Sequence, residues 1–311
     1  MVLVDKHGPP QGDFGDITFT SYRPGELGDA YLCWGDPTPT LLTFPGPRAW
    51  YITEPITHRK FTSKQFRFYE RNRSAFAFLH HSKRADSFVP MHTHYVLDTV
   101  VRPAHQRIDA VVAVVSNHGG RFWRLKPGER ARNQLILDRR VKLFGAPDSW
   151  NSFRRWPWSA ASAPSNYAGG WPANHLVMAH LAQLAEYRVS LCMENASTDM
   201  YFSEKFVNSV RAGCVPIYHA HPSVKATFLQ GAAFVDPADY EFDPQRTIAA
   251  AMSLDHGAVA DQNYAWLSTD IVKSTGNDAI WKKIAKHFSL LLSDFSLSAT
   301  PGGCEPNIGP K

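Results

Sequence analysis

Glu204 and Lys205 are adjacent charged residues that could act on a phosphorylated ligand. Tyr201 and Asn195 lie a few residues upstream, in the same dense polar run. A lysine ammonium at the start of a helix is a place to hold a phosphate, because the helix N-terminus attracts negative charge. A solvated Glu–Lys pair on an exposed face is the alternative interpretation. The polar run lies between two apolar runs, which favours a site.

Two short apolar runs flank this segment, Tyr187–Met193 and Cys214–Tyr218. The first is long enough for a buried strand and too short for a helix, and the second has the same character. With a helix between them, they form a strand–helix–strand unit. In a parallel sheet this unit places the helix N-terminus at the carboxyl edge of the strands, where ligands bind.

The helix between the two strands is predicted from its apolar spacing, with Phe202 and Phe206 one turn apart. Thr198 or Asp199 can cap its N-terminus, because short polar side chains accept hydrogen bonds from the first free amides. Gly213 fits the C-terminal stop, since glycine adopts the left-handed conformation that ends many helices.

The ordered set of motifs resembles the donor-binding signature of the α-1,3/4-fucosyltransferases, glycosyltransferase family 10, and is most similar to the shorter bacterial members. That signature is F-E-N, then Y-[VI]-[TS]-E-K, a helix, and G-x-[VI]-P-[IV]. The corresponding segments here are Met193-Glu194-Asn195, Tyr201-Phe202-Ser203-Glu204-Lys205, Gly213-Cys214-Val215-Pro216-Ile217 and the following His221-Pro222-Ser223-Val224.

The resemblance implies a GT-B fold, an α/β architecture of two Rossmann-like domains that face an interdomain cleft. We expect an acceptor-binding domain over residues 1–104, a donor-binding domain over 105–296 and a flexible tail over 297–311. The family's opening strand and helix are short or missing, so we expect a reduced N-terminal domain with residues 1–16 loose. Near the C-terminus, Trp281, Ile284, Phe288 and Leu291 form a helical apolar stripe that we interpret as a docking surface.

The resemblance also implies an activity, the inverting transfer of L-fucose from GDP-fucose to an oligosaccharide hydroxyl in bacterial surface glycan synthesis or protein glycosylation. Lys205 would hold the pyrophosphate and Glu204 the ribose hydroxyls. Asn195 and Tyr201 would contact the phosphate and the fucose. An N-acetyllactosamine-like or lipopolysaccharide glycan is the expected acceptor. The same signature fits a transferase of the same fold that uses another nucleotide sugar.

Glu54 is the candidate general base. It follows the strand-like Ala49–Thr53 and precedes Pro55. An acceptor hydroxyl is a poor nucleophile until a carboxylate takes its proton in the transition state. The family analogy places a carboxylate at such a strand end. A surface glutamate that caps the turn before Pro55 is the alternative.

Arg132 is the second candidate phosphate ligand, because the family carries an arginine at the matching helix start and guanidinium binds phosphate in a bidentate way. A solvated arginine on the helix surface is the alternative. The chain has no D-x-D triplet, which metal-dependent glycosyltransferases normally carry. We therefore expect no required metal, with Mg2+ or Mn2+ at most stimulatory, and Arg132 and Lys205 stabilising the charge on the leaving GDP.

The chain has 311 residues, enough for two domains of ordinary size. Its net charge of +5 suits an anionic small ligand or membrane surface and is too diffuse for nucleic acid. The four cysteines are widely spaced and predict reduced thiols. No signal peptide or membrane span is recognised, so we expect a cytoplasmic bacterial enzyme with at most peripheral contact with the inner membrane.

Two other features leave alternatives open. His80, His81, His92 and His94 form a local cluster that could make this a non-catalytic metal- or sugar-binding protein. No carboxylate or cysteine is spaced to complete a metal site, so surface or acceptor-cleft histidines are the favoured interpretation. The tryptophan-rich residues 146–171 could stack on sugars and set the acceptor, or pack as a small core.

Overall fold

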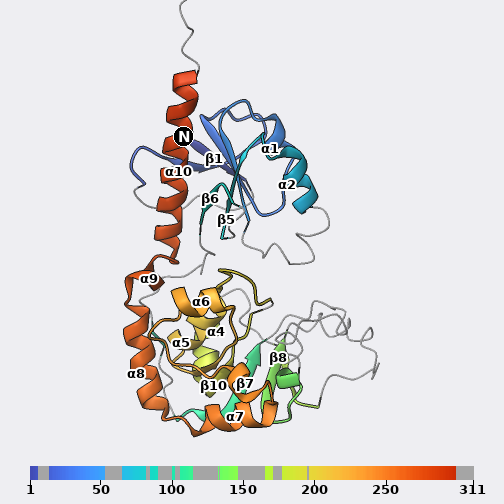
Figure 1. Ribbon diagram of the computed structural model, residues 1–311, viewed down its shortest axis with the longest axis vertical. Coiled ribbons are helices and arrows are strands. Elements are labelled where there is room, and N and C mark those ends of the chain that lie inside the picture. The colour runs from blue at the N-terminus through green and yellow to red at the C-terminus, as the bar shows by residue number, and fades with distance from the viewer. Residues whose placement is uncertain are drawn as a thin grey trace, which may run out of the picture. The chain divides into compact units, whose positions relative to one another are not determined.

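The computed structural model of the chain describes residues 1–5, 14–52, 65–81, 85–89, 100–101, 106–114, 132, 134–145, 165–170, 177–194 and 196–298. The chain divides into two compact units (Figure 1). Unit 1 comprises Met1–Pro90 and Asp278–Lys311, and unit 2 comprises Met91–Asn277.

Unit 1 is built on a parallel six-stranded sheet with the strand order β2-β1-β3-β4-β5-β6. This order reverses direction between β1 and β3, as in doubly wound folds. The strands are β1 (Val2–Asp5), β2 (Phe19–Ser21), β3 (Ala30–Trp34), β4 (Arg48–Tyr51), β5 (Ala77–His80) and β6 (Ser87–Phe88), with helices α1 (Thr40–Thr43) and α2 (Phe66–Asn72).

The first strand corrects the expectation that residues 1–16 are loose, as far as Val2–Asp5 are concerned, whereas residues 6–13 lie outside the described residues. Val2, Leu3 and Val4 are almost completely buried, because β1 is an inner strand that pairs with both β2 and β3. Leu3 packs on one face of the sheet and Val2 and Val4 on the other, as the alternation of strand side chains requires. A four-residue segment can form a stable strand when a neighbouring strand is hydrogen-bonded to each of its edges. The composition of the segment does not show that it has such neighbours.

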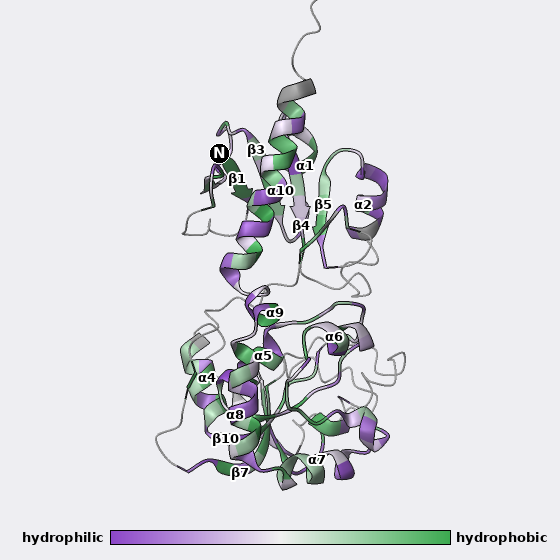
Figure 2. Cartoon of the chain, turned by 60° about the vertical axis from the view of Figure 1, so that its left-hand side comes forward, coloured by the Kyte–Doolittle hydropathy of each residue, from purple (hydrophilic) through white to green (hydrophobic). Residues whose placement is uncertain are grey.

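The long C-terminal helix α10 (Asn277–Ser298) completes the core of unit 1. Trp281, Ile284 and Phe288 are buried against Val2, Val4 and other residues of the sheet. The apolar stripe is therefore a docking surface, but it belongs to unit 1, whereas residues up to 296 were expected in the donor-binding domain. Apolar and polar residues both occur along α10, as an amphipathic helix requires (Figure 2).

Unit 2 is built on a second parallel sheet, with the strand order β11-β10-β7-β8-β9. The strands are β7 (Ile108–Val114), β8 (Val141–Gly145), β9 (Tyr167–Gly170), β10 (Tyr187–Leu191) and β11 (Val215–Ile217). Numbered from β7, the order is 3-2-1-4-5, which is that of the Rossmann fold. The order reverses between β7 and β10, so the carboxyl end of β10 borders the crevice where this fold binds ligands.

Helices cover both faces of this sheet, as buried parallel strands require. The helices of unit 2 whose bounds the structure describes are α4 (Val177–Ala185), α5 (Glu204–Arg211), α6 (Pro222–Thr227), η4 (Pro237–Tyr240), α7 (Pro244–Ser253), α8 (His256–Leu267) and α9 (Asp270–Lys273). One face packs on α7, and the opposite face packs on α4 and α5. Among the helices that the structure describes in either unit, none has the length and apolar character needed to cross a bilayer.

Candidate functional site

The predicted strand–helix–strand unit is confirmed as β10, α5 and β11, with β10 and β11 paired in parallel. Gly213 ends α5 with a φ of 67°, as expected. A side chain there would collide with the Tyr264 hydroxyl and the Arg107 guanidinium, because a Cβ would lie 2.6 and 2.7 Å from them. The unit therefore has the geometry that places the start of α5 at the carboxyl edge of the sheet.

Glu194, just beyond the end of β10, is a buried carboxylate with several hydrogen-bond donors around it. Its Oε1 accepts bonds from the Ser203 amide at 2.8 Å and from the Tyr218 hydroxyl at 2.9 Å. Its Oε2 accepts a bond from the Ser203 hydroxyl at 2.6 Å. A buried charge is tolerated only when it is paired and hydrogen-bonded, and these contacts meet that requirement. Glu194 therefore ties together the ends of β10 and β11 and the start of α5.

The N-cap of α5 is Ser203, which corrects the expectation of Thr198 or Asp199. Ser203 has an extended backbone, with φ −113° and ψ −179°, and its Oγ accepts a bond from the Lys205 amide at 3.4 Å. Residue 199 lies in a turn in which Met200 has a φ of 56°. The Met200 amide donates to Ser223 Oγ at 2.9 Å, so this turn is bonded to α6 and does not continue into α5.

The Lys205 ammonium is surrounded by three acceptors at the start of α5. Its Nζ lies 3.1 Å from Ser203 Oγ, 3.3 Å from Glu194 Oε2 and 3.4 Å from Glu204 Oε1. The Lys205 side chain is 27% exposed, whereas that of Glu194 is 2% exposed. The ammonium therefore lies between a buried carboxylate beneath it and a partly exposed carboxylate beside it.

These charges keep Lys205 cationic. Burial by itself lowers the pKa of the ammonium, but the negative charges of Glu194 and then Glu204 raise it more, so the pKa lies above the usual lysine value. The same interactions place two further predicted site residues within electrostatic range. Tyr201 contributes a rise in the Lys205 pKa, and the positive charge of Arg132 contributes a decrease.

The structure thus brings together Arg132, Tyr201, Glu204 and Lys205, although they come from two separate segments of the chain. Their individual roles as phosphate, sugar and ribose ligands stay predictions. The other two predicted site residues, Asn195 and Glu54, lie outside the described residues, so their placement is not part of this geometry.

Three residues of the site were not predicted as site residues, Glu194, Ser203 and Tyr218. Ser203 is the serine that precedes Glu204 and Lys205 in the recognised motif. Glu194 belongs to the recognised motif, and its position at a strand end beside a polar run was a usable signal. Tyr218 looked like the last apolar residue of a strand, and its hydroxyl is bonded only because β11 lies next to β10. Burial and the neighbouring Glu194 charge raise the pKa of Tyr218 well above its usual value, so it remains a hydrogen-bond donor.

The histidine pair His80–His81 packs inside unit 1. Both rings are buried, with centroids 3.9 Å apart. Burial and then the interaction with His80 lower the pKa of His81 well below its usual value, so His81 is neutral. Both residues are buried, so the surface interpretation is wrong for these two. His92 and His94 lie outside the described residues. Within the described ranges no group of three His, Cys, Asp or Glu side chains is placed to hold a metal ion.

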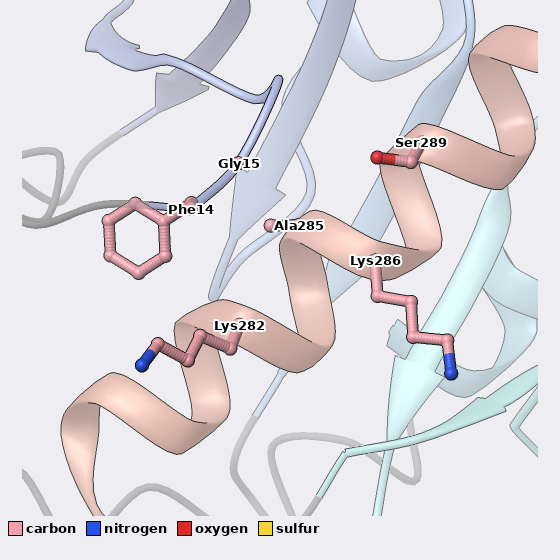
Figure 3. A pocket seen from close by; sticks show the side chains of 6 residues that line it. All are labelled: Phe14, Gly15, Lys282, Ala285, Lys286 and Ser289. Carbon is pink, nitrogen blue, oxygen red and sulfur yellow. The ribbon is translucent and has the colours of Figure 1, made fainter.

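A surface hollow of about 470 Å3 lies in unit 1, between the segment after residue 13 and α10 (Figure 3). Its lining residues are Phe14, Gly15, Lys282, Ala285, Lys286 and Ser289. The two lysine side chains point in different directions in Figure 3, so their charges do not converge on one ligand position. None of the lining residues belongs to the predicted site.

Comparison with solved structures identifies the fold as GT-B. An alpha1,3-fucosyltransferase solved with GDP is similar, with 16% identity, 94% of this chain and 90% of that chain covered, and a TM-score of 0.54. An alpha,alpha-trehalose-phosphate synthase (UDP-forming) from Burkholderia vietnamiensis is similar with 12% identity and a TM-score of 0.51, and the match covers 86% of this chain and 75% of the synthase. S. aureus TarM, solved with UDP, is similar with 10% identity and a TM-score of 0.51, and the match covers 83% of this chain and 55% of TarM. No protein-family model and no curated protein sequence matches the chain.

Proposed function

We propose that this protein is an inverting glycosyltransferase that takes L-fucose from GDP-fucose and attaches it to an oligosaccharide hydroxyl. The observation that carries the proposal is the Lys205 ammonium, fixed by Glu194 and Ser203 at the start of α5. This position lies beside the crevice of a Rossmann-ordered sheet. The shared fold with glycosyltransferases, one of which was solved with GDP, supports a nucleotide-sugar donor.

A phosphate can enter this site by replacing one existing contact. An ammonium has three N–H donors, and Ser203, Glu194 and Glu204 each accept from Lys205. The contact to Glu204 is the longest, at 3.4 Å, and its carboxylate is more exposed than that of Glu194. In the proposed complex the diphosphate takes the place of Glu204 on Lys205. The released Glu204 carboxylate then accepts hydrogen bonds from the ribose hydroxyls.

Charge balance assigns a role to Arg132. Glu194 and Glu204 carry two negative charges against the one positive charge of Lys205, so these three groups have no net positive charge to offer a diphosphate. Arg132 lies within electrostatic range of Lys205 and adds a second cation. The α5 N-terminus adds free amide dipoles that favour an anion. Together these groups stabilise the negative charge that develops on GDP as it leaves.

In the proposed reaction the acceptor oxygen attacks C1 of the fucose on the face opposite the phosphate. The bond from C1 to the acceptor oxygen forms while the bond from C1 to the phosphate oxygen breaks, and its electron pair leaves with GDP. The acceptor proton moves to the Glu54 carboxylate. A β-linked donor therefore gives an α-linked product. The part assigned to Glu54 comes from the sequence resemblance, since this residue lies outside the described ranges.

A second donor is possible within the same fold, because TarM was solved with UDP and the trehalose-phosphate synthase is UDP-forming. A thermal-shift panel of GDP-fucose, other GDP-sugars and UDP-sugars separates these donors. GDP-fucose should raise the melting temperature most. A larger shift from a UDP-sugar would replace the donor assignment while leaving the transferase intact.

The decisive experiment incubates the full chain with GDP-fucose and a panel of oligosaccharides, followed by mass spectrometry. We expect at least one acceptor to gain the mass of one fucose residue. Lys205→Met, which keeps the aliphatic stem, should abolish the product, whereas Lys273→Ala on an exposed part of α9 should not. Failure of every nucleotide sugar to bind would overturn the proposal and favour a non-catalytic protein.

A further inference from the structure

A second polar cluster lies at the carboxyl end of β11, one residue beyond Tyr218. His219 Nδ1 lies 2.8 Å from Asp236 Oδ1, and the same oxygen accepts a bond from the Ala238 amide at 2.9 Å. The other oxygen of Asp236 pairs with the Lys225 ammonium. Burial raises the pKa of Asp236, but the bonds from His219 and Lys225 lower it more, so this carboxyl group is ionised. Both of its oxygens are occupied by these partners.

The cluster fixes the orientation of the His219 ring. Because Asp236 is a carboxylate, the ring donates through Nδ1–H and presents Nε2 on its opposite side. The His219 side chain is 18% exposed and that of Asp236 is 3% exposed. The buried carboxylate therefore fixes the orientation of a partly exposed ring. The ring also packs edge-on against Phe242, with centroids 5.1 Å apart. In the described part of the chain no hydrogen bond is formed to Nε2.

The loop that carries Phe242 has an unusual backbone. Glu241 and Phe242 are consecutive non-glycine residues with φ values of 56° and 60°. Such conformations are unfavourable for side chains with a Cβ and are concentrated at ligand sites. The loop is held at both ends, since Asp236 caps η4 and Asp243 caps α7. The residues around His219 are therefore held in a defined conformation.

The position of this cluster relates it to the Lys205 site. The Tyr218 hydroxyl bonds Glu194, which places the carboxyl end of β11 against the residues that hold Lys205. His219 is the next residue, at the same edge of the same sheet. A ligand lying across the ends of β10 and β11 would meet Lys205 from α5 and His219 from β11.

The charges of the cluster are compatible with an anion. A lone Asp236 carboxylate would repel a phosphate, but Lys225 offsets its charge. With His219 neutral the three groups sum to zero, and with His219 protonated they carry one positive charge. Since the two carboxylates of Glu194 and Glu204 outnumber the ammonium of Lys205, a diphosphate gains from another hydrogen-bond donor.

We propose that His219 is a further ligand-contact residue of the nucleotide bound at Lys205. With Nδ1–H bonded to Asp236, the ring carries a second proton on Nε2 in the complex, as an imidazolium, and this Nε2–H donates a hydrogen bond to a diphosphate oxygen. This inference rests on the proposed function, because it takes the nucleotide diphosphate as the ligand. Asp236 is a positioning residue for the His219 ring, and Lys225 offsets the charge of Asp236.

Two substitutions of His219 separate ligand contact from a structural role. In His219→Asn the side-chain amide lies near the former position of Nδ1, so an N–H donor for Asp236 is kept. This shorter side chain has no atom at the former position of Nε2. The amide of His219→Gln reaches further and supplies an N–H near the position of Nε2. Calorimetry with GDP should show affinity lowered about tenfold by Asn, as for loss of a hydrogen bond to a charged group, and largely retained by Gln. His256→Asn on α8, beside Gly213 ahead of β11, is the matched control and should bind GDP like the unmodified chain.

The outcomes distinguish the two proposals. If the unmodified chain binds GDP and His219→Asn binds equally well, the contact with His219 is overturned while the donor site stands. If the His219→Asn variant binds GDP more tightly than the His219→Gln variant, GDP affinity depends on the bond to Asp236 and not on a donor at the position of Nε2. This result also overturns the inference. If the unmodified chain binds no GDP, the proposed function fails, and the inference fails with it.

Discussion

The Lys205 ammonium lies 3.3 Å from the carboxylate of Glu194, a residue that is almost completely buried at the end of the neighbouring strand. Buried ion pairs contribute little net stability on their own, because both charges lose their hydration. This pair has a different consequence. It fixes a cation at the start of a helix, at the edge of the sheet where ligands bind, and it sets the pKa of that cation.

Lys205→Met should weaken GDP binding by about 1.5–3 kcal/mol, the range for a hydrogen bond to a charged group. Calorimetry measures this directly, and a melting curve shows whether the variant is folded. The exposed Lys273→Met on α9 is the matched control and should retain full affinity. Equal affinity for both variants would remove Lys205 from the phosphate site.

Glu194→Gln should make GDP binding sensitive to alkaline pH. In the unmodified chain the Glu194 charge opposes the decrease in the Lys205 pKa that burial causes. Without this charge the Lys205 pKa is lower, so the ammonium loses its proton at a lower pH. In the variant, GDP affinity should therefore begin to fall at a less alkaline pH than in the unmodified chain. Binding measured from neutral pH to about pH 10, near the ordinary lysine value, should show the difference.

Glu204→Gln provides the comparison for this titration. Its carboxylate raises the Lys205 pKa less than that of Glu194 does, so the alkaline loss of affinity should be smaller. Identical pH profiles for the Glu194 variant and the unmodified chain would show that Glu194 does not control the protonation of Lys205.

Tyr218→Phe should destabilise unit 2 by about 1–3 kcal/mol, because a buried carboxylate loses one of its donors. The Tyr218 hydroxyl is 2.9 Å from Glu194 Oε1, and both side chains are buried. Urea unfolding measures the change. Tyr240→Phe removes a hydroxyl from a half-buried tyrosine in the same unit and should change stability by less than about 0.5 kcal/mol.

Phe288→Ala should destabilise unit 1 by about 3–5 kcal/mol, the usual cost of truncating a buried aromatic ring. Phe288 is 0% exposed on the face of α10 that packs on the sheet, whereas Leu290 two residues later is 58% exposed. Leu290→Ala is therefore the matched control on the same helix. Limited proteolysis should cleave unit 1 of the first variant faster, and equal cleavage of both would contradict the packing of α10.

The sequence predicted the donor-side unit well because its elements are local. The apolar runs of β10 and β11, the helical spacing of Phe202 and Phe206, and Gly213 all lie within one short segment. The N-cap was misplaced because Thr198, Asp199 and Ser203 are all capable of capping. The choice of Ser203 depends on Glu194, which bonds its amide and hydroxyl from another element.

The remaining differences come from contacts between distant segments. Val2–Asp5 has too few residues to be recognised as an inner strand, and its strand character depends on pairing with β2 and β3. The stripe of Trp281 and Phe288 shows that α10 packs on something, but residue spacing does not identify the partner. Likewise, His219 and Asp236 are 17 residues apart, and their contact depends on the parallel bridge between Ile217 and Val235.

Two segments far apart in the sequence, β1 and α10, belong to the same core and therefore to one folding unit. A ribosome therefore makes the whole of unit 2 before it makes the helix that closes unit 1. Until that last helix emerges, one face of the first sheet remains uncovered, with Val2, Val4 and Leu32 open to water or to a chaperone. A stop codon ahead of α10 would thus harm unit 1, although the strands of this unit are synthesised before unit 2.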